Sequence, residues 1–272
     1  MTLASCDSRK TAGANPFFTE WDTPHGVPPF DKILPEHFMP AFERGMSLHE
    51  AEIDAITSNK DEATFENTIL AYDNAGQMLA QTELVFGMLC AAETNDRMQA
   101  LQEQAMPLLA AHRDKIRLDD KLFVRVKEVY DRRAALGLDA EQMRLLQKTY
   151  DSFVRAGALL DAEQKARLKE INGQLSLTAV KFGNNILAEN NNFVLELKSD
   201  ELDGLPAGIR DAAREKAQQM GKGDKWVFTL HKPSLIPLLT YSTRRDLREK
   251  IYKAYLNRCN NGDEYDNKQL LN

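Results

Sequence analysis

The sequence of 272 residues lacks the features of several large protein classes. It has only three cysteines, Cys6, Cys90 and Cys259, and their odd number and wide spacing exclude a disulfide framework and a four-cysteine zinc site. No apolar run approaches the ~18 residues of a membrane-spanning helix. Fourteen glycines and ten prolines exclude a collagen-like or low-complexity chain. A net charge of −6 without a stripe of Lys and Arg argues against nucleic acid as a partner.

What remains has the composition of a soluble globular protein, with 43% hydrophobic and 28% charged residues. A chain of this length buries roughly three quarters of its unfolded surface, so it needs neither a disulfide nor a metal to fold. One large domain and two smaller ones are both compatible with the length.

The first fifteen residues have the character of a tether. Leu3-Ala4-Ser5-Cys6 resembles a bacterial lipobox, in which the cysteine is acylated after signal cleavage, and residues 7–15 are small and polar. We therefore expect residues 1–15 to be a polar tether or signal remnant and Cys6 to be a lipidation site. The protein would then be a lipoprotein of the cell envelope facing the periplasm, with the membrane reached only through this anchor. A chance match would instead place it in the cytoplasm.

Residues 16–34 are predicted to be an extended arm, because proline fixes φ and removes amide donors. Its aromatic side chains need a surface to cover, so we expect the arm to pack along the helices that follow. They are Phe17, Phe18, Trp21 and Phe30.

Residues 35–190 form a predicted helical domain, since apolar residues recur there at steps of three and four. Helices are expected over residues 35–57, 64–92, 96–116 and 121–136. Two more are expected after Asp139 and Asp161, because each aspartate has Gln three residues later, as in a capping box. The apolar stripe expected for the second helix is Phe65, Ile69, Tyr72, Leu79, Leu84 and Met88.

Residues 191–272 are of mixed character. Residues 193–197 and 226–230 are predicted to pair as a two-stranded sheet, with a helix over 206–220 between them. A basic helix is expected over 244–258, capped by Thr243. An acidic turn at 263–268 predicts the start of one more helix, which stops after Leu270 and Leu271. We therefore expect the chain to be truncated at Asn272.

Motifs that carry chemistry are scarce. His49-Glu50 opens a His-Glu-x-x-His zinc motif, but Ile53 occupies the place of the second histidine. His37 and His112 are expected on helices far from other ligands. Cys90 is expected to be a small buried hydrophobe. The basic helix is expected to be a solvated face that pairs with acidic neighbours, the alternative being that it faces a substrate carboxylate. These residues assign neither a catalytic nor a metal site.

Several stretches nevertheless resemble one known family. They are NPFF (15–18), WDTP (21–24), PPFDKI (28–33), PEHFMPAFE (35–43), TFENT (64–68), AQQMG (217–221), WVFTL (226–230) and RRDLREKIYKAY (244–255). In order and spacing they resemble the N-terminal part of bacterial peptidyl-dipeptidases (dipeptidyl carboxypeptidases) of the thimet oligopeptidase family of zinc metallopeptidases.

The resemblance implies a mostly α fold, the multi-helix N-terminal half of a two-lobed, channel-forming zincin-like peptidase, with a small two-stranded β element near 193–230. The parent enzyme would use zinc to release dipeptides from the C-terminus of oligopeptides. The family's zinc motif lies beyond residue 272, so no catalytic or metal residue carries over, and this part alone is expected to be inactive and to bind no zinc. Its partners would be oligopeptide substrates together with the missing C-terminal half. The alternative is a stand-alone, non-catalytic helical peptide-binding or scaffold protein.

Overall fold

A computed structural model describes residues 14–271, which are mostly α-helical with a single pair of short strands among them. The fold class expected from the sequence is therefore confirmed. The chain divides into two compact units, Met1–Leu177 and Thr178–Asn272, with the boundary inside the long helix α7 (Ala162–Asn192). Within residues 14–271, no helix combines the length and the apolar character that crossing a membrane requires.

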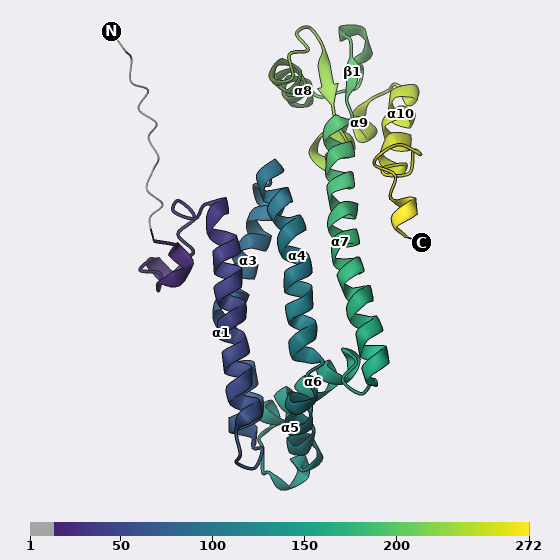
Figure 1. The fold of residues 1–272 in the computed structure, drawn as a ribbon. Helices are drawn as coiled ribbons and strands as arrows, with labels where there is room; N and C mark the ends of the chain where they lie inside the picture. Colours follow the sequence, from purple (N-terminus) through teal and green to yellow (C-terminus); the bar gives the residue numbers. More distant parts are fainter. Residues whose placement is uncertain (1–13, 272) are drawn as a thin grey trace, which may run out of the picture. The chain divides into compact units, whose positions relative to one another are not determined.

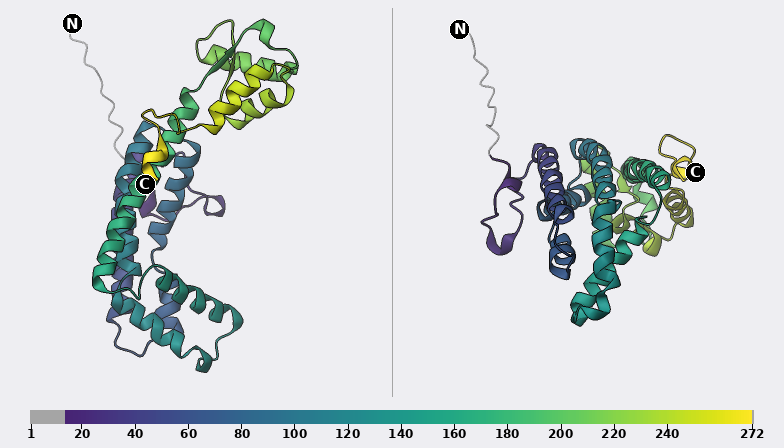
Figure 2. Two further views of the ribbon diagram at one scale, coloured as in Figure 1. Left: turned by 90° about the vertical axis from the view of Figure 1, so that its right-hand side faces the viewer. Right: turned by 60° about the horizontal axis from the view of Figure 1, so that its bottom comes forward.

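The first unit is built on three long helices that run side by side (Figures 1 and 2): α1 (Phe38–Ser58), α3 (Gln77–Ala92) and α4 (Asp96–Arg117). A short turn, η3 (Pro35–His37), leads into α1. The helices α1 and α3 approach closely at Gly45, where a Cβ atom would lie 3.0 Å from the Cα of Leu79. Three phenylalanines on α1 and α3 lie at the centre of the core between these helices. The ring centroid of Phe86 lies 4.9 Å from that of Phe38 and 5.3 Å from that of Phe42.

The N-terminal arm contains only the short turns η1 (Pro16–Phe18) and η2 (Pro24–Gly26). Phe17 is buried against Phe38, with ring centroids 5.4 Å apart, and Arg44 lies 4.6 Å over the ring of Phe18. The arm therefore packs on the following helices, as expected. Phe30 is an exception, because it stays 40% exposed.

The single helix predicted over 64–92 is wrong. A π-helical turn, η4 (Phe65–Leu70), and the short α2 (Ala71–Asp73) come first, and the chain then breaks before α3. Gly76 makes the break with a φ of +75°, and its N–H donates to the Glu52 carboxylate at 2.7 Å. The break changes the helical phase, so α3 buries Val85 and Phe86 while the predicted core residue Leu84 is 66% exposed.

The rest of the first unit comprises α5 (Asp120–Asp131), α6 (Ala140–Arg155) and the first part of α7. The helix predicted to reach 136 ends at 131, and the turn η5 (Arg133–Ala135) takes its place. Both expected capping boxes are present, since the N–H groups of Gln142 and Gln164 donate to Asp139 and Asp161, each at 2.8 Å. These helices and η4 share a second core, whose largest members are Phe65, Phe123 and Phe153.

The second unit contains the two predicted strands, β1 (Leu195–Leu197) and β2 (Trp226–Phe228), paired antiparallel with Glu196 opposite Val227. Each strand is two residues shorter than predicted. The turn η6 (Ser199–Glu201) follows β1, and the helices are α8 (Ala207–Gln219), α9 (Lys232–Tyr241) and α10 (Arg245–Leu256). In the left view of Figure 2 these helices flank the strands, with which they share one core.

Two predictions about the ends of helices in this unit are wrong. Thr243 does not cap α10, because its hydroxyl donates to the Asp203 carboxylate at 2.5 Å. The acidic turn near 263 leads only into a 3-10 turn, η7 (Asn267–Leu270). Asn267 is buried and accepts a hydrogen bond from Asn185 on α7 at 2.8 Å, so this turn is attached to α7.

Candidate functional site

No group of three or more His, Cys, Asp or Glu side chains among residues 14–271 is arranged to hold a metal ion. His49 and Glu50 lie on α1, and Ile53, one turn further on, is buried in the core. The described residues therefore do not fit the zinc that the resemblance implies.

The structure does bring two histidines together. His49 Nδ1 on α1 lies 3.0 Å from His112 Nε2 on α4, and the other ring nitrogen of His112 lies 3.5 Å from a carboxylate oxygen of Glu50. The expectation that His112 would be remote from other potential ligands is therefore wrong. Burial lowers the pKa of both imidazoles, so a neutral pair sharing one N–H is favoured. The pair is a polar link between α1 and α4.

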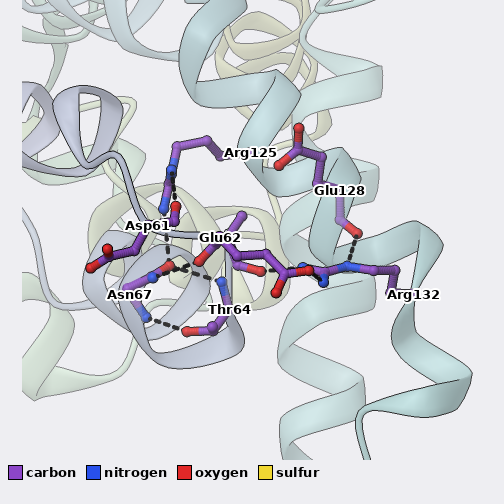
Figure 3. Close-up of polar contacts among 8 residues, drawn as sticks. Asp61, Glu62, Thr64, Asn67, Arg125, Glu128 and Arg132 are labelled. Atoms are coloured by element: carbon purple, nitrogen blue, oxygen red, sulfur yellow. Dashed lines mark hydrogen bonds and ion pairs between the residues drawn. The ribbon is translucent and has the colours of Figure 1, made fainter.

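A second polar cluster is centred on Arg125, a buried arginine of α5 (Figure 3). Its Nη1 donates to the carbonyls of Asn59 and Asp61 at 3.0 and 3.1 Å, and its Nη2 donates to Asn67 Oδ1 at 3.1 Å. Asn67 and Thr64 in turn form a reciprocal capping box at the start of η4.

Arg132 directly follows the last residue of α5, about two helical turns after Arg125, and adds to the same attachment. It donates to the carbonyl of Ala63 and forms an ion pair with Glu62. Backbone carbonyls are the main acceptors in this cluster. Its role is to fix residues 59–67 on α5, so the TFENT stretch is here a helix start held in place by arginines.

The basic residues of α10 mostly bind groups of this chain. Arg244 forms a bidentate pair with Asp246 at 2.9 and 2.7 Å, and Lys253 pairs with Glu249 at 2.5 Å. Arg258 stacks on Tyr255 and donates to Asn190 at 3.0 Å. These contacts favour the paired, solvated face over a site for a substrate carboxylate.

The cysteines offer no reactive thiol within residues 14–271. Cys90 is half-buried beside the phenylalanine core of α1 and α3, as expected, and burial raises the pKa of its thiol to about 11. Burial also raises the pKa of the Cys259 thiol to about 11. Both thiols are therefore protonated and poorly nucleophilic near neutral pH. The predicted lipidation site, Cys6, lies outside the described residues.

Comparison with known proteins shows a consistent relationship, although no family model matches the chain. It is 36% identical to the dipeptidyl carboxypeptidase of Escherichia coli over 94% of this chain and 38% of that protein. It is 25% identical to oligopeptidase A of E. coli over 92% of this chain and 37% of that protein. The organellar oligopeptidase A of Arabidopsis thaliana is 24% identical over 96% of this chain and 33% of the plant protein.

The chain is homologous to the dipeptidyl carboxypeptidase and the oligopeptidase A of E. coli. It matches the N-terminal part of these larger peptidases and spans about two fifths of the length of the relatives named above. The polar clusters described above therefore lie in a helical part that is homologous to the N-terminal part of these peptidases. Within this part, the family-like stretches at 15–18 and 64–68 serve packing and helix capping.

Proposed function

We propose that this chain forms the N-terminal, channel-wall portion of a zinc metallopeptidase that releases dipeptides from the C-terminus of oligopeptides. The observation that carries the proposal is the 36% identity to dipeptidyl carboxypeptidase along 94% of the chain, against 25% to oligopeptidase A. The higher identity favours dipeptide release over the activity of the oligopeptidases.

The role proposed for the described residues is to bind and enclose the oligopeptide. They include no fitting set of metal ligands, so we assign the metal and the reacting groups to polypeptide beyond this part. The phenylalanine core and the two arginine attachments on α5 make the first unit a firm wall, because buried aromatic contacts and bonded guanidinium groups resist local opening.

The test begins with the coding region beyond the codon of Asn272. We expect an open frame that encodes a His-Glu-x-x-His helix, and a stop codon at that point would overturn the proposal in favour of the stand-alone peptide-binding protein. The product of the whole frame should release C-terminal dipeptides from an N-acetylated pentapeptide, as detected by mass spectrometry, and a chelator should abolish the release.

Two controls make the assay specific. Cleavage of the same peptide only at bonds other than the one between its third and fourth residues would contradict dipeptide release. The 272-residue chain alone should give no product. If it bound stoichiometric zinc and released dipeptides, the assignment of the chemistry to other polypeptide would be wrong.

We also propose that Cys6 carries a lipid and anchors the protein at the cell envelope, on the basis of the Leu3-Ala4-Ser5-Cys6 sequence. A bacterial host that expresses the full reading frame should incorporate labelled fatty acid into the protein. The Cys6→Ser variant should not be labelled. Equal labelling of the two proteins would remove the anchor and favour the cytoplasm.

A further inference from the structure

A groove in the first unit is lined mainly by positively charged side chains. It has a volume of about 450 Å³ and lies where α6 meets the end of α4, near the lower end of α4 in Figure 1. The side chains that line it include Arg117 of α4 and Arg144, Lys148, Asp151, Ser152 and Arg155 of α6. The α6 members recur at steps of three and four, so they form one stripe along the helix.

The cations that line the groove outnumber its carboxylates, and a further carboxylate, that of Glu83, interacts electrostatically with Arg117. Four cations face one carboxylate, an excess of three positive charges in a protein whose net charge is −6. None of the four forms an ion pair with a carboxylate among residues 14–271. Arg117 lies close to the Tyr72 hydroxyl. Asp151 accepts a hydrogen bond from Gln147 at 2.9 Å.

Such a concentration of like charge is unfavourable unless an anion binds to it. Like charges that lie close together repel one another, and a ligand with several negative charges would reduce this repulsion. The ligand must be extended, because the stripe is long. With a rise of 1.5 Å per helical residue, Arg144 and Lys148 are separated by about 6 Å along α6, and Lys148 and Arg155 by about 10 Å.

The spacing matches an extended peptide better than a compact anion. In an extended chain, side chains on one face repeat about every 6.6 Å, so carboxylates at alternate residues match the step between Arg144 and Lys148. Arg155 lies about 4 Å further along α6 than the next such carboxylate, a gap that two long, flexible side chains can span. A single phosphate would reach only part of it. Nucleic acid is less well matched, because the groove has no aromatic lining residue for base stacking and the protein as a whole repels a long polyanion.

We propose that this groove binds a short, extended segment of an acidic oligopeptide. The site goes beyond the proposed peptidase function, because it selects peptides by charge at a place that contains no reacting group. Its test is direct binding, which does not require catalysis, so the two proposals fail independently.

The experiment measures fluorescence anisotropy of an uncharged dye attached to the peptide Glu-Gly-Glu-Gly-Glu, acetylated and amidated so that only side chains carry charge. The control peptide has Gln in place of Glu. We expect the purified protein to bind the acidic peptide and not the Gln peptide, with affinity that falls as salt is raised from 50 to 500 mM. Equal binding of the two peptides would overturn the proposal.

Matched variants locate the site. Arg144→Gln/Lys148→Gln should bind the acidic peptide about tenfold more weakly, the size expected from losing two exposed ion pairs. Lys32→Gln/Lys169→Gln removes the same charge from exposed positions of the first unit outside the groove and should bind as the parent does. Equal weakening in both variants would show general charge attraction and overturn the groove as the site.

Two further ligands test whether the groove binds an acidic peptide, a phosphate compound or a nucleic acid. Tripolyphosphate and a pentathymidine oligonucleotide are added as competitors at the concentration of the acidic peptide. The proposal requires both to compete less well than unlabelled Glu-Gly-Glu-Gly-Glu. Stronger competition by either would assign the groove to a phosphate ligand or to single-stranded nucleic acid instead.

Discussion

Replacing Gly204 by alanine should strongly destabilise the second unit. Gly204 has a φ of +81°, a left-handed conformation that alanine adopts at a cost. A Cβ atom there would lie 2.2 Å from the carbonyl oxygen of Tyr241 and 3.0 Å from the amide nitrogen of Thr243. Both atoms belong to the backbone, so no side chain can rotate away to make room. A hydrogen bond also joins the two segments here, because the N–H of Thr243 donates to the carbonyl of Asp203 at 3.2 Å.

The expected loss follows from two contributions. The left-handed conformation costs alanine about 1–2 kcal/mol, and forcing an extra methyl group into a packed site costs about 1–3 kcal/mol. Gly204→Ala should therefore lower the free energy of unfolding by about 2–5 kcal/mol. Gly221→Ala is the matched control, because Gly221 has a φ of +67° but no atom within 4 Å of the added Cβ. Its cost should be about 1–2 kcal/mol.

The assay is urea unfolding followed by the fluorescence of Trp226, which lies on β2 and reports on the second unit. Trp21 is replaced by phenylalanine in all samples, because it is the protein's other tryptophan and lies in the arm of the first unit. Equal losses for Gly204→Ala and Gly221→Ala would refute the argument, since the backbone clash would then contribute nothing.

Three further outcomes are expected in the first unit, each measured by urea unfolding. Val85→Ala should lower the free energy of unfolding by about 2 kcal/mol because Val85 is buried, whereas Leu84→Ala should change it by less than about 0.5 kcal/mol. A larger loss for Leu84→Ala than for Val85→Ala would instead support the single uninterrupted helix predicted from the sequence. Arg125→Met should cost about 3 kcal/mol because it removes three hydrogen bonds that a charged, buried guanidinium donates, and a neutral effect would contradict its anchoring role. The pKa values of His49 and His112 are lowered in the folded state, so their contribution to stability is complete above the usual pKa of 6.5 and is lost as the pH falls below it. A His49→Gln/His112→Gln variant should therefore lose less stability between pH 7.5 and 5 than the parent does. If the variant and the parent lost the same amount of stability over this range, the histidine pair would be excluded as a cause of the pH dependence.

Features that depend on near neighbours were predictable from the sequence. The capping boxes after Asp139 and Asp161 join residues three positions apart, so their pattern is visible in the sequence itself. The strands and the long helices α1, α4 and α7 also carry their own periodicity, and their bounds differ from the predictions by a few residues. The family was recognisable for a related reason, because short stretches in a fixed order survive in the sequence.

Features that depend on distant partners required the tertiary structure. The break before α3 is stabilised by Glu52, 24 residues earlier, and without it the helical phase of α3 cannot be predicted. His49 and His112 are 63 residues apart and meet only because α1 packs on α4. In the cationic groove, the stripe on α6 is visible in the spacing of its residues, but Arg117 joins it from another helix. Helix propensity and capping depend on residues within about one helical turn. Which helices come into contact depends on packing between residues that are far apart in the sequence, so a local sequence pattern does not predict it.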